Sequence, residues 1–562
     1  MPTSGAQAFV EMLSRAGVRY LFGNPGTTEL PLCDVLAREP RLEYILGLQE
    51  VPVMSMADGY AMASGSLGVV NLHVSCGLGN AMGMLYNAHR EGTPLLVTAG
   101  QQDRRLKFEE PILWGDLATV ARPWTKWSVE VDRVEDLPSA LRRGMQMALT
   151  PPTGPVFLSL PLDVQTATAE LDLTVPRPLE TRVRPPLAAL RRAAEVLAVA
   201  ARPAILVGSR VVERDAVAEL VAVAERLGAP VIAEPAHTLG RQSFPCRHPL
   251  YAQSMPLWSP EIREALAPYD VLLVVGMDLL RQYVYHEPSR AIPERARIVH
   301  FDEDAYQLGK NYPLEVAVLG DTKVGLAELA ELLDGVQSDR ARGIAAERAA
   351  TLARTHAEQR TQLLREIDAE RERRPITPLV LMESIARVLP AEVAVIEEAV
   401  TTTSSTLQRL GALRNTTGYF GHRGWALGWG LGCAVGVKLA WPERPVLAIV
   451  GEGSAMYGIA ALWSAAHHRL PVTFVICNNR QYQILKAGAL GMGLPGARKH
   501  QFVGMDLVDP EIDFVALARA LGVDAERITE PEALSAAVAD SLAGDRPRII
   551  EVPIEPSLAG PK

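Results

Sequence analysis

The sequence predicts an α/β protein made of three open, doubly wound domains, each built on a mostly parallel sheet. Short apolar runs alternate with helical patterns along almost all of the 562 residues, and this alternation is typical of βαβ units. Two stretches interrupt it: residues 175–186 are rich in Pro and Arg, and residues 335–374 are charged and carry no strand signal. The predicted units are an N-terminal α/β domain (1–175), a central α/β domain (187–335), a charged helical linker (336–375) and a C-terminal α/β domain (376–556).

The strands are predicted from short apolar runs, and the helices from apolar residues spaced three and four apart. In the first domain we expect strands at 20–22, 44–48, 69–74, 95–99 and 156–160, with helices at 53–63 and 81–90. In the second domain we expect strands at 204–207, 230–233, 271–275 and 297–301, with a helix at 216–227. In the third domain we expect strands at 393–396, 446–450, 472–477 and 548–552, with a helix at 459–468.

The composition argues against several classes of protein. A hydrophobic fraction of 48% with 22% charged residues is that of a globular chain rather than a disordered one. The 56 basic residues are spread along a chain of net charge −9, so no nucleic-acid partner is expected. The sequence has neither a long uncharged apolar run nor a signal-peptide pattern, so we expect a cytoplasmic protein without a membrane partner. The five cysteines lie far apart without a C-x-x-C motif, which argues against disulfides and structural zinc.

The most specific motif lies in the third domain. The apolar strand at 446–450 runs into Gly-Glu-Gly-Ser-Ala (451–455), and the next strand ends in Asn478-Asn479. Adjacent parallel strands deliver such residues to one edge of the sheet, where a helix N-terminus also favours an anion. Glu452 and Asn479 supply the hard oxygen ligands that suit Mg²⁺ with phosphate. The alternative is an ordinary strand-to-helix turn with Glu452 on the surface.

This arrangement resembles the signature of thiamine diphosphate enzymes, in which Gly-Asp-Gly and a later Asn hold Mg²⁺ and the diphosphate. The sequence departs from it by having Glu452 in place of the usual Asp. The resemblance implies that Glu452, Asn479 and the backbone carbonyl of Gln481 bind the metal. It also implies that Gly453, Ser454 and Ala455 contact the cofactor, together with Asn479.

The first domain contains a second motif of this family. Glu50 follows a predicted strand and precedes a predicted helix. By the resemblance, it is the carboxylate that binds N1′ of the cofactor's aminopyrimidine ring and activates the cofactor. Taken alone, a glutamate in this position is more often an acid at a helix N-terminus, favoured by the helix dipole.

The resemblance extends along nearly the whole chain and is to the 2-oxo acid decarboxylase and acetolactate synthase superfamily, most closely to the benzoylformate decarboxylases. This names the domains: pyrimidine-binding, central and diphosphate-binding. The matching motifs are FGNPGTTELP (22–31), LQE (48–50), NLHVSCG (71–77), GNAMG (79–83) and VTAGQQ (97–102), with Trp463 after the Gly-Glu-Gly-Ser turn.

The family pattern implies roles for further residues. Thr27 replaces a serine that contacts the substrate carboxylate, and His73 matches a histidine that relays protons near the substrate. Leu427 aligns with the bulky residue beneath the cofactor, and Thr401 and Thr402 resemble hydroxyls on the diphosphate. Each has an ordinary structural alternative: a turn threonine, a satisfied polar residue, a core leucine and a helix-capping run, respectively.

The substrate pocket is where the sequence departs most from the family. The second active-site histidine of the family aligns with Tyr283, and His286 lies three residues further on. Ile484 is expected to face the substrate. The aromatic residues that would follow it for an aryl substrate are replaced by small residues over 487–495.

The sequence therefore predicts a thiamine diphosphate- and Mg²⁺-dependent decarboxylase that converts a 2-oxo acid to an aldehyde. One alternative is an acetolactate synthase-like carboligase, and another is a catalytically silent homologue that binds the cofactor. Glu50 and Glu452 lie in different domains, and relatives pair these domains across a dimer. We therefore expect active sites between subunits and a homotetramer built as a dimer of dimers.

Overall fold

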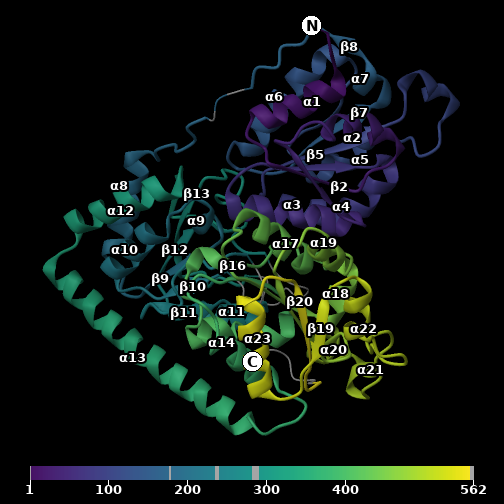
Figure 1. The fold of residues 1–562 in the computed structure, drawn as a ribbon. Helices are drawn as coiled ribbons and strands as arrows, with labels where there is room; N and C mark the ends of the chain where they lie inside the picture. The colour runs from purple at the N-terminus through teal and green to yellow at the C-terminus, as the bar shows by residue number, and fades with distance from the viewer. Residues whose placement is uncertain (1, 176, 178, 235–239, 282–289, 557–562) are drawn as a thin grey trace.

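The structure is a computed structural model, and it describes residues 2–175, 177, 179–234, 240–281 and 290–556. Its core consists of three six-stranded sheets in which every neighbouring pair of strands is parallel. Each sheet is flanked by helices and occupies one of the three predicted α/β regions (Figure 1). The predicted fold class is confirmed.

The first sheet has the strand order β3-β2-β4-β5-β7-β6. The order reverses between β2 and β4, and ligands of open α/β sheets bind at such a reversal, beyond the carboxyl ends of the strands. The strands are β2 (Tyr20–Gly23), β3 (Glu43–Leu46), β4 (Gly68–Leu72), β5 (Leu95–Gln101), β6 (Ser128–Glu130) and β7 (Val156–Pro161). The helices are α1 (Gly5–Arg15), α2 (Leu30–Leu36), α3 (Glu50–Ser64), α4 (Val74–Glu91), α5 (Leu117–Ala121), α6 (Leu137–Leu149) and α7 (Leu162–Thr166), and a short ribbon pairs β1 (Thr3–Ser4) with β8 (Thr168–Ala169).

The third sheet repeats this order as β16-β15-β17-β18-β20-β19, with its reversal between β15 and β17. Its strands are β15 (Ala394–Glu398), β16 (Tyr419–Phe420), β17 (Val446–Gly451), β18 (Thr473–Asn478), β19 (Asp524–Arg527) and β20 (Arg548–Pro553). Its helices are α14 (Pro378–Ala386), α15 (Val400–Thr403), α16 (Thr406–Leu410), α17 (Trp429–Ala440), α18 (Glu452–Gly458), α19 (Ala461–His467), α20 (Gln483–Gly491), α21 (Pro495–Arg498), α22 (Phe514–Ala520) and α23 (Pro531–Ala543).

The central sheet differs, with the order β11-β10-β9-β12-β13-β14 that is common in dinucleotide-binding folds. At its reversal, Arg210 is buried in ion pairs with Asp302 (2.8 Å) and Asp278 (3.0 Å). The strands are β9 (Pro203–Val207), β10 (Val231–Ala233), β11 (Tyr251–Ser254), β12 (Val271–Val275), β13 (Arg297–Asp302) and β14 (Val316–Leu319). The helices are α8 (Leu187–Ala198), α9 (Arg210–Glu213), α10 (Val217–Leu227), α11 (Ser259–Leu266) and α12 (Thr322–Val336).

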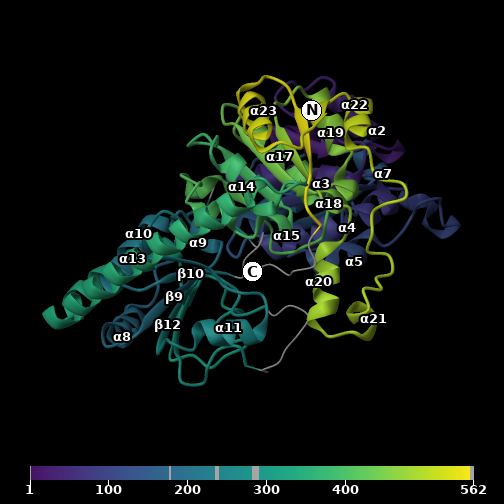
Figure 2. The same cartoon turned by 90° about the horizontal axis from the view of Figure 1, so that it is seen from below.

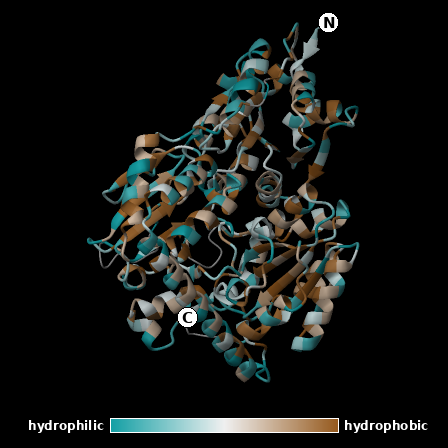
Figure 3. Cartoon of the chain, turned by 90° about the vertical axis from the view of Figure 1, so that its left-hand side faces the viewer, coloured by the Kyte–Doolittle hydropathy of each residue, from teal (hydrophilic) through white to brown (hydrophobic). Residues whose placement is uncertain are grey.

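The predicted charged linker is the long helix α13 (Asp339–Glu370). It packs against α10 of the central domain and against α14 and α16 of the third domain (Figures 1 and 2). Apolar residues concentrate in the strands, and hydrophilic residues predominate on the outer loops and helices (Figure 3). Among the described residues, no helix combines the length and the apolar character that crossing a membrane requires.

The first and third domains meet through α3 and α17. Gly59 lies against the backbone of Cys433, while Gly432 lies against Ser55 and Gly436 against Met56. A Cβ atom on any of these three glycines would lie within 2.7 Å of the facing helix, so the glycines permit the close helix contact. The Nε1 group of Trp429 donates a hydrogen bond to Asp58 across the same contact, at 2.6 Å.

The short ribbon of β1 and β8 is absent from the sequence prediction, and so are five strands of the three six-stranded sheets: β6, β11, β14, β16 and β19. All five are edge strands, and none is longer than four residues. Of the boundaries that differ, two concern the candidate site. The strand predicted at 69–74 ends at Leu72, so His73 caps α4, and the helix predicted at 459–468 is preceded by α18, which begins at Glu452 itself.

Candidate active site

Glu50 is the first residue of α3, beyond the carboxyl end of β3. Its carboxylate is buried, with 6% of the residue exposed. The side-chain amide of Asn24 donates to its Oε1 (3.2 Å), and that of Asn80 donates to its Oε2 (3.0 Å). These two hydrogen bonds hold the Glu50 carboxylate, whose oxygens only accept, in one orientation.

His73 is held by a buried carboxylate that the sequence reasoning did not single out. Its Nδ1 lies 2.8 Å from Oε2 of Glu29, which is 1% exposed. The same carboxylate accepts hydrogen bonds from the backbone N–H groups of Gly26 (3.0 Å) and Gly100 (2.9 Å) and from the hydroxyl of Thr28 (2.8 Å). Because a carboxylate only accepts, Nδ1 of His73 donates, and this tautomer leaves Nε2 available to a substrate.

The local backbone explains how this pair forms. A Cβ atom on Gly26 would lie 2.2 Å from the His73 ring, and one on Gly100 would lie 2.0 Å from Oε1 of Glu29. Val74, the residue after His73, has a φ of +42°, which is a strained value for a β-branched residue. Such strain concentrates at functional sites, and here it sets the direction in which His73 leaves β4.

Thr27 lies at the start of a short 3-10 turn (Thr27–Glu29) after β2, and its side chain is exposed. The turns after β2 and β4 flank the reversal of the first sheet, so Thr27, Glu50 and His73 share one edge of it. The residues missed from the sequence are Glu29, Asn24 and Asn80. All three stand within the quoted motifs, but a motif gives no contact partner, and only the fold brings them to Glu50 and His73.

The second group of residues lies at the matching edge of the third sheet. Glu452 begins α18 and is 4% exposed, and its Oε1 accepts a hydrogen bond from the backbone N–H of Gln481 (3.1 Å). That N–H also lies 3.0 Å from Oδ1 of Asn479, so the two side-chain oxygens converge on one loop. Arg480, between them, has a φ of +61°, which turns the chain sharply after β18.

These residues fit a hard divalent cation. Burial raises the pKa of Glu452 to about 7, although backbone N–H groups favour its charged form. A buried carboxylate without a cationic partner is costly, and a bound cation removes that cost. One carboxylate with amide and carbonyl oxygens is the donor set that Mg²⁺ takes together with phosphate and water. Among the described residues, no group of three or more His, Cys, Asp or Glu side chains is placed so that it could hold a metal ion.

The elements around Glu452 also fit an anion. Thr401 and Thr402 lie in α15, directly after β15, and neither α15 nor α16 has a side-chain cap. Ser404 and Ser405 then adopt φ values of +42° and +53°, and N–H groups in such a turn converge on an anion. Gly453, Ser454 and Ala455 form the first turn of α18, where a Cβ on Gly453 would lie 2.6 Å from the Tyr482 ring.

Leu427 is half-buried on the loop before α17. Glu398, at the end of β15, accepts hydrogen bonds from the N–H groups of residues 428, 429 and 430 at 2.8–3.1 Å. Ile484 is half-buried on α20, and the neighbouring Lys486 donates to the Gln481 side chain at 2.8 Å. Tyr283 and His286 lie outside the described residues, so their predicted roles stay predictions.

The comparisons with known proteins agree with this geometry. Three family models match in order: the N-terminal TPP binding domain of thiamine pyrophosphate enzymes over residues 3–111, their central domain over 190–329, and their C-terminal TPP binding domain over 399–552. Benzoylformate decarboxylase of Pseudomonas aeruginosa is 35% identical, over 98% of both chains.

Two further proteins are similar to this chain over nearly its whole length, at lower sequence identity. The acetolactate synthase large subunit of Parasynechococcus marenigrum is 28% identical, over 98% of this chain and 87% of its own. The thiamine diphosphate-dependent 4-hydroxybenzoylformate decarboxylase of Rhodococcus jostii superposes with a TM-score of 0.86 at 30% identity, covering 99% of this chain and 100% of that one. With two cofactor-binding domains and a central domain in the family's order, the chain belongs to the thiamine pyrophosphate enzymes.

Proposed function

We propose that the protein decarboxylates a 2-oxo acid to an aldehyde, with thiamine diphosphate and Mg²⁺ as cofactors. The observation that carries this proposal is the pair of half-sites at the two sheet edges. One holds the buried Glu50 beside the Glu29–His73 pair, and the other holds Glu452 and Asn479 around one loop. The similarity to decarboxylases of aryl 2-oxo acids supports the same reaction.

In this proposal the cofactor supplies the electron sink for the carbon–carbon cleavage, and the chain supplies orientation and protons. Glu50, fixed by Asn24 and Asn80, accepts the hydrogen bond of the aminopyrimidine ring. The Thr27 hydroxyl binds the substrate carboxylate. His73, whose Nδ1 proton is donated to Glu29, uses Nε2 to exchange protons with the substrate oxygen.

Glu452, the side chain of Asn479 and the backbone carbonyl of Gln481 would hold Mg²⁺ against the diphosphate. The N–H groups of residues 453–455 at the start of α18 and the Thr401–Thr402 turn would contact the phosphate oxygens. The extra methylene of Glu452, compared with the aspartate of the family pattern, is accommodated because its Oε1 already reaches the loop after β18.

We further propose that the active centre lies between subunits of a dimer of dimers. Apolar side chains are exposed near both half-sites: in the first domain Phe108 is 100% and Ile112 83% exposed, and in the third Tyr457 is 57% exposed. Ser75, in the first turn of α4, holds the Phe108–Ile112 loop by donating to the carbonyl of Leu113 at 2.7 Å. Exposed apolar side chains gathered at a site indicate a surface that a partner covers.

The test is a panel of 2-oxo acids, including pyruvate and phenylglyoxylate, assayed for CO₂ release with added thiamine diphosphate and Mg²⁺. Glu50→Gln is the matched control, since it should still bind the cofactor but lose more than nine-tenths of kcat, a barrier increase above about 1.4 kcal/mol. Equal turnover by Glu50→Gln would remove Glu50 from the mechanism.

A carboligase is the second candidate, because the chain also resembles an acetolactate synthase along its length. Adding an acceptor aldehyde to the same assay separates the two reactions: a decarboxylase releases mainly aldehyde, whereas a carboligase forms mainly the hydroxyketone. Calorimetric binding of the cofactor without any turnover across the panel would instead indicate a catalytically silent homologue.

A further inference from the structure

The loop that carries Leu427 is held by all three domains. We call residues 421–428 the wedge loop. In the third domain, Nδ1 of His422 accepts a hydrogen bond from the N–H of Trp425 (2.9 Å), and Trp425 has a φ of +64°. From the central domain, Arg281 donates to the carbonyl of Arg423 (2.9 Å), and the carbonyl of Gly240 accepts from the N–H of Gly421 (2.9 Å).

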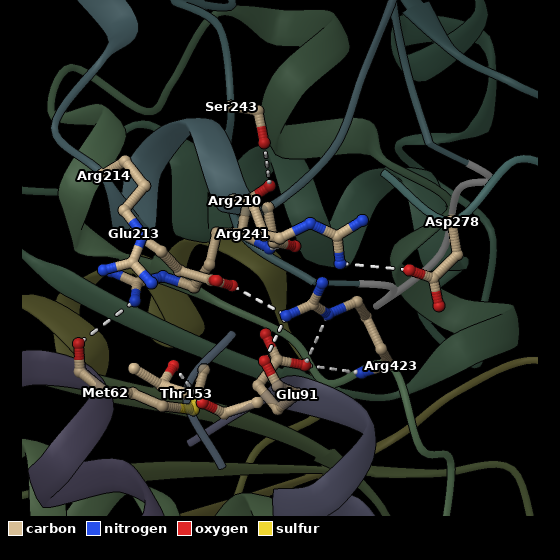
Figure 4. Close-up of polar contacts among 12 residues, drawn as sticks. Met62, Glu91, Thr153, Arg210, Glu213, Arg214, Arg241, Ser243, Asp278 and Arg423 are labelled. Atoms are coloured by element: carbon tan, nitrogen blue, oxygen red, sulfur yellow. Dashed lines mark hydrogen bonds and ion pairs between the residues drawn. The ribbon is translucent and has the colours of Figure 1, made fainter. Parts of the chain in front are cut away.

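The centre of this attachment is Arg423, whose side chain is 2% exposed. Its guanidinium lies between Glu91, at the end of α4, and Glu213, in α9 of the central domain (Figure 4). The backbone N–H of Arg423 donates to Oε2 of Glu91 at 2.9 Å, and Nη2 lies 2.8 Å from Oε1 of Glu213. The position of the wedge loop therefore depends on how the three domains are assembled.

Asn87, in α4, binds the wedge loop most directly. It is fully buried, its Oδ1 accepts from the N–H of Ala426 (2.9 Å), and its Nδ2 donates to the carbonyl of Ala426 (2.8 Å). A Cβ atom on Gly424 would lie 2.2 Å from Oδ1 of Asn87. Leu427 is the next residue after Ala426, so Asn87 fixes the peptide from which the Leu427 side chain projects.

The N-terminal half of α4 contributes to the half-site around Glu50. His73 caps the helix, Asn80 donates to Glu50, and Asn87 binds the wedge loop. Asn80 and Asn87 are seven residues apart within α4, which is nearly two turns of an α-helix, so they lie along one face. One rigid helix face thus carries the positioning contacts for both half-sites of a single chain.

We propose that α4 is a positioning element shared by two active centres, and that Asn87 sets the position of Leu427 in the centre that its own Glu50 does not serve. The proposal rests on the proposed function, in which the two half-sites of one chain belong to different centres. Asn87 is a positioning residue: it touches neither cofactor nor substrate and acts through the wedge loop.

The first test compares Asn87→Ala with Asn71→Ala. Asn71 is a matched control, because it is also a buried asparagine of the first domain, hydrogen-bonded to Thr98 (3.0 Å), and has no contact with the wedge loop in the structure. We expect Asn87→Ala to increase amide hydrogen exchange in residues 424–428 and to raise the calorimetric Kd for thiamine diphosphate roughly tenfold. Asn71→Ala should change neither. Equal effects from both variants would show a general loss of stability and overturn the proposal.

The second test mixes two tagged chains and purifies the hybrids. The hybrids are assayed at a thiamine diphosphate concentration near the wild-type Kd, where Asn87→Ala lowers activity. A hybrid of an Asn87→Ala chain with a Glu50→Gln chain contains one centre with an intact Glu50 and an intact wedge loop, so about half of wild-type activity should return. A hybrid of the wild-type chain with a chain carrying both changes contains no intact centre and should stay impaired. The reverse outcome, activity only in the second hybrid, would show that Asn87 acts on the centre of its own Glu50.

These measurements distinguish a failure of the proposed function from a failure of the proposed role of Asn87. If the wild-type protein binds no thiamine diphosphate, the proposed function fails, and hydrogen exchange in residues 424–428 still decides whether Asn87 holds the wedge loop. If the cofactor binds and Asn87→Ala leaves both Kd and exchange unchanged, the proposed function stands and the role of Asn87 is refuted.

Discussion

Replacing Glu29 by Gln tests whether His73 acts in the tautomer that its contact with the Glu29 carboxylate implies. The carboxylate accepts four contacts, two on each oxygen: Thr28 and Gly100 on Oε1, and Gly26 and His73 on Oε2. A glutamine amide offers one oxygen and one NH₂ group. Whichever way it is oriented, one backbone N–H, of Gly26 or of Gly100, then faces the NH₂ group and loses its acceptor.

The magnitude follows from these contacts. A buried N–H without an acceptor costs about 1–3 kcal/mol, so the variant should fold with a lower thermal midpoint. If the amide NH₂ faces His73, the hydrogen bond reverses, Nδ1 becomes the acceptor, and the proton moves to Nε2. The imidazole then presents the wrong group to the substrate, and the loss in kcat should be about 10²- to 10³-fold, or about 3–4 kcal/mol.

The assay is CO₂ release with the best substrate of the panel, measured for Glu29→Gln, His73→Ala and the double variant. If Glu29 acts only through His73, the double variant should be no slower than His73→Ala, since the two losses are one contribution. Multiplicative losses would refute the reasoning, and so would activity within threefold of the wild type in a Glu29→Gln variant whose His73 carries its proton on Nε2. The ¹⁵N chemical shifts of the His73 ring give an independent reading of the tautomer.

Three further outcomes follow from the structure. Glu452→Ala should lose Mg²⁺-dependent cofactor binding, whereas Glu452→Asp should keep it with equal or better affinity. A Mg²⁺ titration at fixed thiamine diphosphate measures both variants. Normal binding by the alanine variant would show that Glu452 is not a metal ligand. The active species should sediment as a dimer of dimers, and a fully active monomer would contradict the shared centre. Burial raises the pKa of Asp58 to about 6, so the folded state holds a proton that the unfolded chain releases above about pH 4. Stability should therefore fall by about 3 kcal/mol as the pH rises from about 3 to about 7, and urea unfolding of Asp58→Asn should lack that slope.

The sequence predicted the central strands well and the edge strands poorly, for a physical reason. Strands such as β9, β12 and β17 are buried along almost their whole length, so they appear as continuous apolar runs. The five missed strands are short and lie at the sheet edges, and β6 has no fully buried residue. With one neighbour and partial burial, such strands require little apolar sequence.

The candidate site shows a similar division. The sequence singles out Glu50 and Glu452 because each follows a predicted strand and precedes a predicted helix, and the structure places each at the start of a helix. Glu29 was not singled out from the sequence because its proposed role depends on its contact with His73, which is 44 residues away in the chain. The attachment of the wedge loop was missed for the same reason, since Asn87 and Ala426 are 339 residues apart.

The helix contact between the first and third domains has a consequence for the history of the chain. Ser55 pairs with Gly432, Gly59 with Cys433, and Met56 with Gly436. Each residue of α3 can be matched to a residue of α17 by the constant offset that matches Ser55 to Gly432. Met56 is then matched to Cys433, and Gly59 to Gly436. Ser55 therefore contacts its own match, whereas Met56 and Gly59 each contact the match of the other.

This is the pattern of a two-fold, self-complementary interface, and the two sheets also share one strand order. It is the arrangement that an ancestral domain paired with its own copy would leave after duplication and fusion. The same offset carries Glu50 onto Leu427. The position of the proposed activating acid in one copy therefore corresponds to an apolar residue in the other, as expected if two copies of one loop diverged into a proposed proton acceptor and a proposed steric support.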